Sequence, residues 1–225
     1  MQQHPSFLLL GDSITQQGSD PRISGFQALL QGDYIRRVDV INRGLSGYNT
    51  RWFLDTLPQI LNDAYADRTA PLLITLFLGA NDATPEGRSQ YVSLTDYDKN
   101  LHSIINLLRH SFPSSKVLLI TPPAISDSRD CGRRNDVAEK YAIACQAVGK
   151  ALSVPVVDVW TPMQDDRNSY LSDGLHLNAK GNLTVYNALT AQIKASYPEL
   201  VPDNIPFYYL PWTSLAEADA KRNAQ

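Results

Sequence analysis

Three residues of this chain have the types needed to attack a carbonyl carbon. Ser13 closely follows a run of four apolar residues, Phe7 to Leu10, and a glycine, Gly11. Asp173 and His176 stand three residues apart near the other end of the chain. In a helical turn residues at this spacing are neighbours, so Asp173 could accept the Nδ1 proton of His176 and leave Nε2 free as a base. Ser13 is then a candidate nucleophile, because a hydroxyl needs such a base to become reactive.

Each of these residues also has a purely structural interpretation. Gly-Asp-Ser is a common turn tripeptide, and Asp12 is expected to stabilise a turn rather than to take part in chemistry. His176 could be a structural histidine at a helix start. The candidate roles of Ser13 and His176 therefore depend on what other residues of the chain are brought to the same place.

The apolar runs of the chain predict the elements that would position these residues. Short continuous runs predict buried strands, at residues 7–10, 38–41, 72–78, 117–120 and 154–159. Apolar residues at helical spacing predict helices, at residues 25–37, 50–64, 95–110, 137–152 and 179–197. Pro58 predicts a kink or a break in the second helix, and Pro155 indicates a strand start or a sheet edge.

Alternating strands and helices predict a parallel sheet with helices on both faces. We expect a three-layer α/β/α sandwich with five parallel strands in the flavodoxin-like order 2-1-3-4-5. The carboxyl ends of such strands meet at one edge, which would gather Ser13 after the first strand, Gly44 after the second and Asn81 after the third. Gly44 could equally be a turn glycine, and Asn81 could cap a helix or a turn.

Composition excludes several classes of protein. The 225 residues carry a net charge of −3, so no basic field is available for nucleic acid or an anionic membrane. Cys131 and Cys145 lack metal-ligand spacing and fit inert thiols in a reducing compartment. The N-terminus lacks the features of a signal peptide, the C-terminal Asn-Ala-Gln matches no retrieval or peroxisomal signal, and no apolar stretch is long enough for a membrane span. These features predict a soluble, cytoplasmic protein with no integral membrane association.

Four short motifs resemble the sequence blocks of the SGNH (GDSL) hydrolases. They are GDSIT at 11–15, Gly44, GAND at 79–82 and DGLH at 173–176. They occur in the order and spacing of that family, and the similarity covers roughly residues 6–196. Within the family, NRGLSGYNT at 42–50 and DGLHLNAKGN at 173–182 are similar to the isoamyl acetate-hydrolysing esterase branch, as are GANDA at 79–83 and the segment at 91–101.

The resemblance implies a set of roles at this edge of the sheet. Ser13 would be the nucleophile, His176 the general base and then acid, and Asp173 the residue that orients it. The oxyanion hole would consist of the backbone N–H groups of Ser13 and Gly44 and the side-chain amide of Asn81. It also implies a serine esterase that cleaves small carboxylic esters through an acyl-enzyme, with no metal or cofactor.

Three other functions remain open from the sequence alone. The superfamily also contains carbohydrate O-deacetylases and enzymes of the thioesterase or lysophospholipase type, and a fold does not fix a substrate. A non-catalytic binding module is the alternative from another class. Loops 83–94 and 121–135 are expected to shape the substrate pocket.

The chain divides into a hydrolase domain, residues 1–200, and a C-terminal tail, residues 201–225. Residues 202–212 contain three prolines and four aromatic residues, so we expect this segment to be ordered rather than solvated. Two docking surfaces are open: the chain's own helices, or an edge of the active-site cleft or a partner subunit in a homodimer. Residues 217–225 are expected to stay solvated as a short surface helix.

Overall fold

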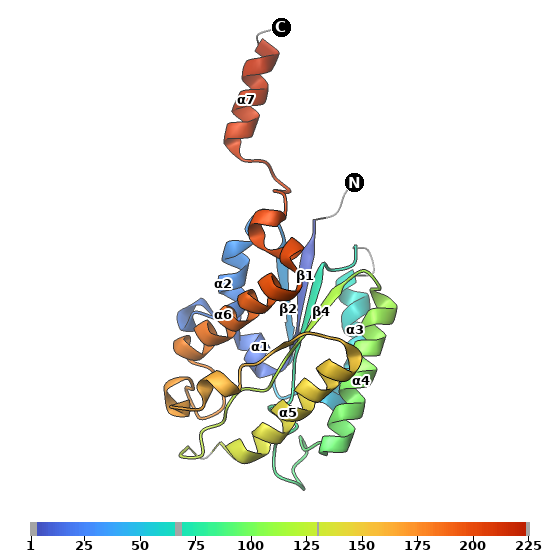
Figure 1. The fold of residues 1–225 in the computed structure, drawn as a ribbon, viewed down its shortest axis with the longest axis vertical. Coiled ribbons are helices and arrows are strands. Elements are labelled where there is room, and N and C mark those ends of the chain that lie inside the picture. Colours follow the sequence, from blue (N-terminus) through green and yellow to red (C-terminus); the bar gives the residue numbers. More distant parts are fainter. Residues whose placement is uncertain (1–3, 66–68, 130, 224–225) are drawn as a thin grey trace.

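A computed structural model describes residues 4–65, 69–129 and 131–223 of the chain. Residues 1–3 and residues 224 and 225 lie outside the described residues. The expectations about the N-terminus and about the C-terminal Asn-Ala-Gln fall partly on these residues. Five parallel strands form one sheet in the order β2-β1-β3-β4-β5 (Figure 1), which confirms the predicted fold and strand order. The strands are β1 (Ser6–Gly11), β2 (Asp39–Gly44), β3 (Leu73–Phe77), β4 (Lys116–Ile120) and β5 (Val156–Val157).

Two layers of helices cover the sheet. Helices α2 (Phe26–Asp33) and α6 (Ala179–Ser196) pack on one face. Helices α3 (Thr50–Tyr65), α4 (Leu94–Ser111) and α5 (Asn135–Leu152) pack on the other. No helix within the described ranges has the length and apolar character that crossing a membrane requires.

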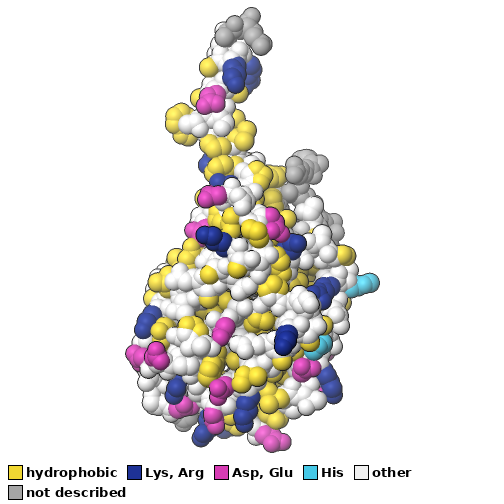
Figure 2. All heavy atoms as spheres, in the orientation of Figure 1, with side chains coloured by type: hydrophobic (Ala, Val, Ile, Leu, Met, Phe, Trp, Pro, Cys, Tyr) yellow, Lys and Arg dark blue, Asp and Glu magenta, His cyan; other side chains and the backbone are white. Residues whose placement is uncertain are grey.

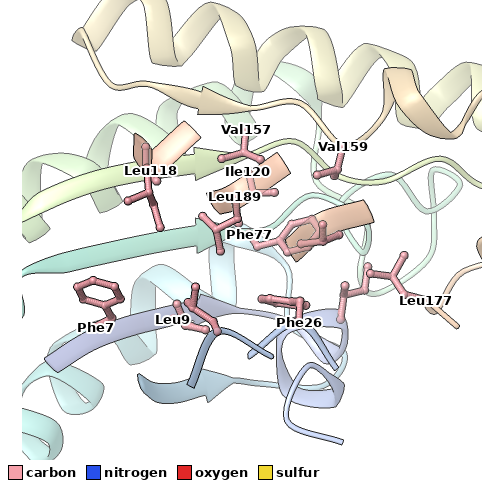
Figure 3. Packing of buried hydrophobic residues seen from close by; sticks show 14 of the residues in the cluster. Phe7, Leu9, Phe26, Phe77, Leu118, Ile120, Val157, Val159, Leu177 and Leu189 are labelled. Carbon is pink, nitrogen blue, oxygen red and sulfur yellow. The ribbon is translucent and has the colours of Figure 1, made fainter. Parts of the chain in front are cut away.

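The strand β1 shows why the sheet is buried on both faces. Phe7 and Leu9 point into the cluster under α2 and α6, while Leu8 and Leu10 point into the cluster under α3, α4 and α5. All four side chains are fully buried. Figure 3 shows Phe7 and Leu9 packed in the first cluster with Leu118 and Leu189. A strand with two buried faces requires a continuous apolar run, as this sequence has.

The structure differs from the predicted elements at several boundaries. Strand β2 continues through polar residues to Gly44, because residues 42–44 keep their pairing with residues 9–11 of β1. Strand β5 is reduced to two residues at the sheet edge. Helix α3 contains Pro58 without a break, and Phe53 and Leu57 bury its inner face. Helix α4 begins at Leu94, one residue before the predicted start, because Ser93 caps it.

Two glycines let the short helix α1 (Ser13–Gln17) lie directly against the sheet. A Cβ atom on Gly11 would stand 2.1 Å from Thr15 Oγ1, and one on Gly44 would stand 2.1 Å from the backbone N of Gln16. Both distances are too short for any side chain. Gly44 is therefore a close-packing glycine within a strand, and these contacts fix the helix that begins with Ser13.

The C-terminal tail changes character along its length. Ile205 is buried, the N–H of Tyr208 donates to the carbonyl oxygen of Arg36 (2.9 Å), and the Arg37 guanidinium lies 3.8 Å above the Phe207 ring. Helix α7 (Trp212–Asn223) then projects away from the body (Figure 1) and buries none of its residues. Figure 2 shows apolar surface at the base of this projection. Trp212, the first residue of α7, is 76% exposed, and Leu210, two residues before it, is 57% exposed.

Candidate active site

Ser13 lies at the carboxyl edge of the sheet, two residues after the end of β1. The chain turns at Asp12, whose carboxylate Oδ1 accepts the N–H of Ile14 at 2.9 Å and caps α1. Asp12 therefore has the turn-stabilising contact that the sequence predicts. Among the described residues nothing accepts a hydrogen bond from the N–H of Ser13, which leaves this donor available at the same point as the hydroxyl.

His176 reaches Ser13 from a loop that precedes α6. Its Nε2 lies 2.9 Å from Ser13 Oγ, and its Nδ1 lies 2.6 Å from Asp173 Oδ2. The sheet and α6 thus bring together residues that are 163 positions apart in sequence. Serine, histidine and carboxylate form one continuous chain of hydrogen bonds, in the order that proton transfer from the serine requires.

The Asp173–His176 segment is not the helical turn that the residue spacing suggested. Gly174 has φ +98°, a left-handed conformation that favours glycine, and the segment is irregular. Asp173 Oδ1 accepts the N–H groups of Leu175 (2.9 Å) and His176 (2.8 Å), so the carboxylate closes the turn by itself. The residues are neighbours because of this side-chain-closed turn.

The environment of Asp173 favours its ionised form. Partial burial raises the pKa of this carboxyl, but the hydrogen bonds from the His176 ring and from the two backbone N–H groups outweigh burial and bring the pKa to about 2. At neutral pH Asp173 is a carboxylate that accepts the Nδ1 proton. His176 Nε2 is then the basic nitrogen that faces Ser13.

Asn81 follows β3 at the same edge. One N–H of its side chain donates to the carbonyl oxygen of Tyr48 (2.9 Å), and Oδ1 accepts from Arg133 Nη2 (2.7 Å) and Gln90 Nε2 (3.1 Å). An amide nitrogen has two N–H groups. The second one is available for a ligand, while the rest of the side chain is held.

Gly44 is expected from the resemblance to donate its N–H to the oxyanion, but this N–H already has an acceptor in the protein. Its N–H donates to the side-chain Oδ1 of Asn42 at 2.8 Å. Asn42 is itself held, because its Nδ2 donates to the carbonyl oxygen of Thr15 (2.6 Å). A ligand that used the Gly44 N–H would have to share it with Asn42 or displace that side chain.

Two further carboxyl groups are buried near these residues. Burial raises the pKa of Asp12 to about 7 and that of Asp82 to about 6. Hydrogen bonds from the N–H and hydroxyl of Thr50 partly offset the effect at Asp82 and tie it to the start of α3. The contacts of Asp82 are therefore structural ones, with the start of α3.

Sequence reasoning missed Gln90 and Arg133. Both lie in the loops between regular elements, residues 83–94 and 121–135, that were expected to shape the pocket. Neither has a motif around it, and only the folded structure shows that both reach the Asn81 amide. Among the described residues no group of three or more His, Cys, Asp or Glu side chains is arranged to hold a metal ion.

A parallel sheet between two helical layers, with a serine, a histidine and a carboxylate linked at its carboxyl edge, defines the class of α/β hydrolytic enzymes. Residues 9–183 match the model of the GDSL-like lipase/acylhydrolase family. The chain belongs to this family and is a carboxylic ester hydrolase.

Individual relatives and a solved structure agree with this assignment. The chain is 39% identical to the isoamyl acetate-hydrolyzing esterase 1 homolog of Rattus norvegicus, over 88% of this chain and 86% of that protein. It is 38% identical to the corresponding protein of Homo sapiens, over 95% and 89%. The crystal structure of a lipase/acylhydrolase from Enterococcus faecalis superposes with a TM-score of 0.67 and 27% identity, covering 85% of this chain and 96% of that one.

Proposed function

We propose that the protein is a serine esterase that hydrolyses small carboxylic esters of the acetate type through an acyl-enzyme intermediate. The observation that supports this most strongly is the unbroken chain of hydrogen bonds from Ser13 Oγ through His176 to Asp173. A binding module would have no use for a base placed 2.9 Å from a hydroxyl.

The first half of the reaction follows from this geometry. Ser13 Oγ attacks the ester carbonyl carbon, and its proton moves to His176 Nε2. Asp173 stays ionised and stabilises the imidazolium through the Nδ1–H hydrogen bond, as its low pKa allows. The tetrahedral intermediate then expels the alcohol oxygen, which takes the proton from Nε2, and Ser13 keeps the acyl group.

The second half repeats these transfers with water. Water gives a proton to His176 Nε2 and attacks the acyl carbon, and the new tetrahedral intermediate expels Ser13 Oγ. The serine recovers its proton from Nε2, and the carboxylic acid leaves. Protein groups perform every step of this scheme, so it requires no metal or cofactor.

We expect two donors to stabilise the negative oxygen of both intermediates. They are the backbone N–H of Ser13 and the second side-chain N–H of Asn81. The Gly44 N–H is the third donor of the proposal, and it joins the other two when its hydrogen bond to Asn42 is shared or exchanged.

The proposed substrates are small because of the relatives that the chain resembles. Those in rat and human are named for the hydrolysis of isoamyl acetate, an ester with a two-carbon acyl group.

Covalent labelling tests the nucleophile. An alkyl phosphonate ester probe should modify Ser13 in the wild-type protein and leave Ser13→Ala unmodified, as found by mass spectrometry of the peptides. Labelling elsewhere, or none at all in a folded sample, would favour a binding module.

A substrate series tests the ester class. We expect kcat/KM to be highest for acetate esters and to fall as the acyl chain lengthens towards decanoate, with the amide analogue not cleaved. An acetylated sugar and an acetyl thioester complete the series. A preference for either of these over isoamyl acetate would replace the proposed substrate class with that one.

A further inference from the structure

Arg133 lies behind the Asn81 amide, on the segment that connects β4 to α5, and it is half-buried. Its Nη2 donates to Asn81 Oδ1 (2.7 Å) and to Gln90 Oε1 (3.2 Å). Its Nε donates to the carbonyl oxygen of Ala80 (2.7 Å), and its Nη1 to that of Cys131 (3.2 Å). The guanidinium therefore binds both the side chain of Asn81 and the backbone carbonyl just before it.

All four of these acceptors are neutral oxygens. Within the described residues no carboxylate lies at ion-pair distance from Arg133, in contrast to its neighbour Arg134, whose Nε is 2.9 Å from Asp136. Burial lowers the pKa of Arg133, and Cys131, Asp12 and Asp173 only partly offset this effect. A positive charge thus stands next to the proposed oxyanion donor, and no described carboxylate lies at ion-pair distance from it.

The contacts fix which way the Asn81 amide faces. Arg133 is only a donor, and so is the Gln90 Nε2 that reaches the same atom, so Oδ1 must face them. The amide nitrogen then faces the carbonyl oxygen of Tyr48, which accepts one of its two N–H groups. Donation to Oδ1 also polarises the amide and makes its free N–H a stronger donor.

We propose that Arg133 is a positioning residue that holds and polarises Asn81 as an oxyanion donor, an inference that rests on the proposed serine-esterase function. The negative charge of the tetrahedral intermediate develops on the side of Asn81 opposite the guanidinium. The positive charge therefore stabilises the transition state more than the neutral ground-state ester.

Substitution of Arg133 should lower kcat more than it raises KM. For Arg133→Ala we expect kcat on a short acetate ester to fall roughly 10–100-fold, less than the 10²–10³-fold loss expected for Asn81→Ala, which removes the donor itself. KM should change little, because the ground-state ester carries no charge for the arginine to stabilise. Arg134→Ala is the matched control: it removes an exposed arginine one position away and should leave kcat and KM unchanged.

A double-mutant cycle separates positioning from a general structural role. If Arg133 acts through Asn81, Arg133→Ala should cost almost nothing further in the Asn81→Ala protein. Guanidinium ion at non-denaturing concentration should restore part of the kcat of Arg133→Ala, but none in the double variant. If Arg133→Ala does not fold, the cycle is run with Arg133→Lys, which keeps the charge but cannot reach all four oxygens and should have an intermediate kcat.

Two results would overturn the inference. One is a kcat unchanged by both Arg133 substitutions, and the other is a full loss that multiplies with that of Asn81→Ala. The Ser13→Ala variant keeps this failure distinct from failure of the proposed function. An inactive Ser13→Ala protein beside a fully active Arg133→Ala protein removes only the role of Arg133, whereas an active Ser13→Ala protein removes the esterase mechanism itself.

Discussion

At the residue scale, Asp12 and Asp173 show how the surroundings give two carboxyl groups opposite properties. Asp12 is fully buried and receives one backbone N–H, so burial dominates and its pKa rises to about 7. Asp173 is less buried and receives three hydrogen bonds, so its pKa falls to about 2. Only Asp173 is therefore ionised throughout the pH range in which an imidazole titrates, which suits the residue that orients His176.

The nucleophile gives the first prediction. Ser13→Ala should lower kcat on a short ester by about 10⁴-fold or more, because serine, histidine and carboxylate act as a unit. The side chain is small and packs at the end of β1, so Tm should stay close to that of the wild type. Steady-state kinetics and thermal unfolding measure the two quantities. A variant with a tenth of wild-type activity would show that another residue is the nucleophile.

The acid limb of the activity profile gives the second prediction. A neutral imidazole must accept the Ser13 proton, so kcat/KM should fall as the pH is lowered. Asp12, the residue before Ser13, has a pKa of about 7 and titrates in the same experiment. Asp12→Asn is the control, since its amide oxygen can still accept the Ile14 N–H. If kcat/KM of Asp12→Asn still falls at low pH, the fall is due to His176. If it no longer falls, the fall in the wild type is due to Asp12.

The same substitution gives a third prediction, on stability. A carboxyl with a higher pKa in the folded protein than in the unfolded chain binds its proton more tightly when folded. Its stabilising contribution is complete below the unfolded pKa near ~4 and is lost as the pH rises to about 7. Asp12→Asn should therefore raise Tm relative to the wild type more at about pH 8 than at about pH 5. Asp82 and Arg133 face the same region and are unchanged in both proteins, so an equal Tm difference at the two pH values would contradict a raised pKa.

At the element scale, regular structure could be predicted from the sequence far better than the contacts between loops. Continuous apolar runs located all five strands, since a strand buried on both faces has no alternative composition. The boundary of β2 was wrong because pairing with β1, and not local apolarity, keeps polar residues 42–44 in the sheet. Arg133 and Gln90 could not be found, because neither loop has a periodicity that specifies what its side chains touch.

The loop before α6 gives the fourth prediction. Gly174 has φ +98°, a conformation that residues with a side chain rarely adopt, and a Cβ atom added there would stand 2.9 Å from the Cβ of Arg129. Gly174→Ala should therefore distort the turn that holds His176. A displacement of about 1 Å can cost about 10²-fold in rate, and we expect kcat to fall by roughly that factor. Gly87→Ala is the matched control. Gly87 has φ +85° but no atom within 4 Å of its added Cβ, so any loss shared by both variants comes from backbone strain alone. Equal kcat values in the two variants would show that the turn tolerates the change.

At the scale of the whole molecule, the proposed active site and the tail lie at opposite ends of the sheet. The tail contacts His4, which precedes β1, and Arg36 and Arg37, which precede β2. Ser13 follows the other end of β1, which puts a strand length of roughly 20 Å between them. Direct contact between the tail and an ester bound at Ser13 would therefore require a second molecule.

The tail gives the fifth prediction, which concerns self-association. Leu210, Trp212 and Leu215 are exposed on a 12-residue segment or beside it, and so short a helix is marginal in water without a covering surface. We expect two copies of the chain to cover these side chains in a homodimer. A chain ending at Tyr209 should then keep its Tm and lose the dimer in light scattering, whereas one ending at Glu199 should also lose Tm, because Leu200 and Ile205 are buried. The homodimer is excluded if the wild type is monomeric and the chain ending at Tyr209 shows no change in oligomeric state or acyl-chain preference.

The two loops that reach Asn81 have a consequence for how new substrate preferences could evolve. Loops 83–94 and 121–135 are expected to shape the pocket, and they also supply Gln90 and Arg133, which hold the amide from behind. A mutation that reshapes either loop for a larger ester would also disturb turnover of the original ester. Lineages that change acyl preference should therefore alter side chains at the loop tips and keep Gln90 and Arg133. Exchange of a whole loop between relatives should lower kcat before it broadens the range of esters that the enzyme accepts.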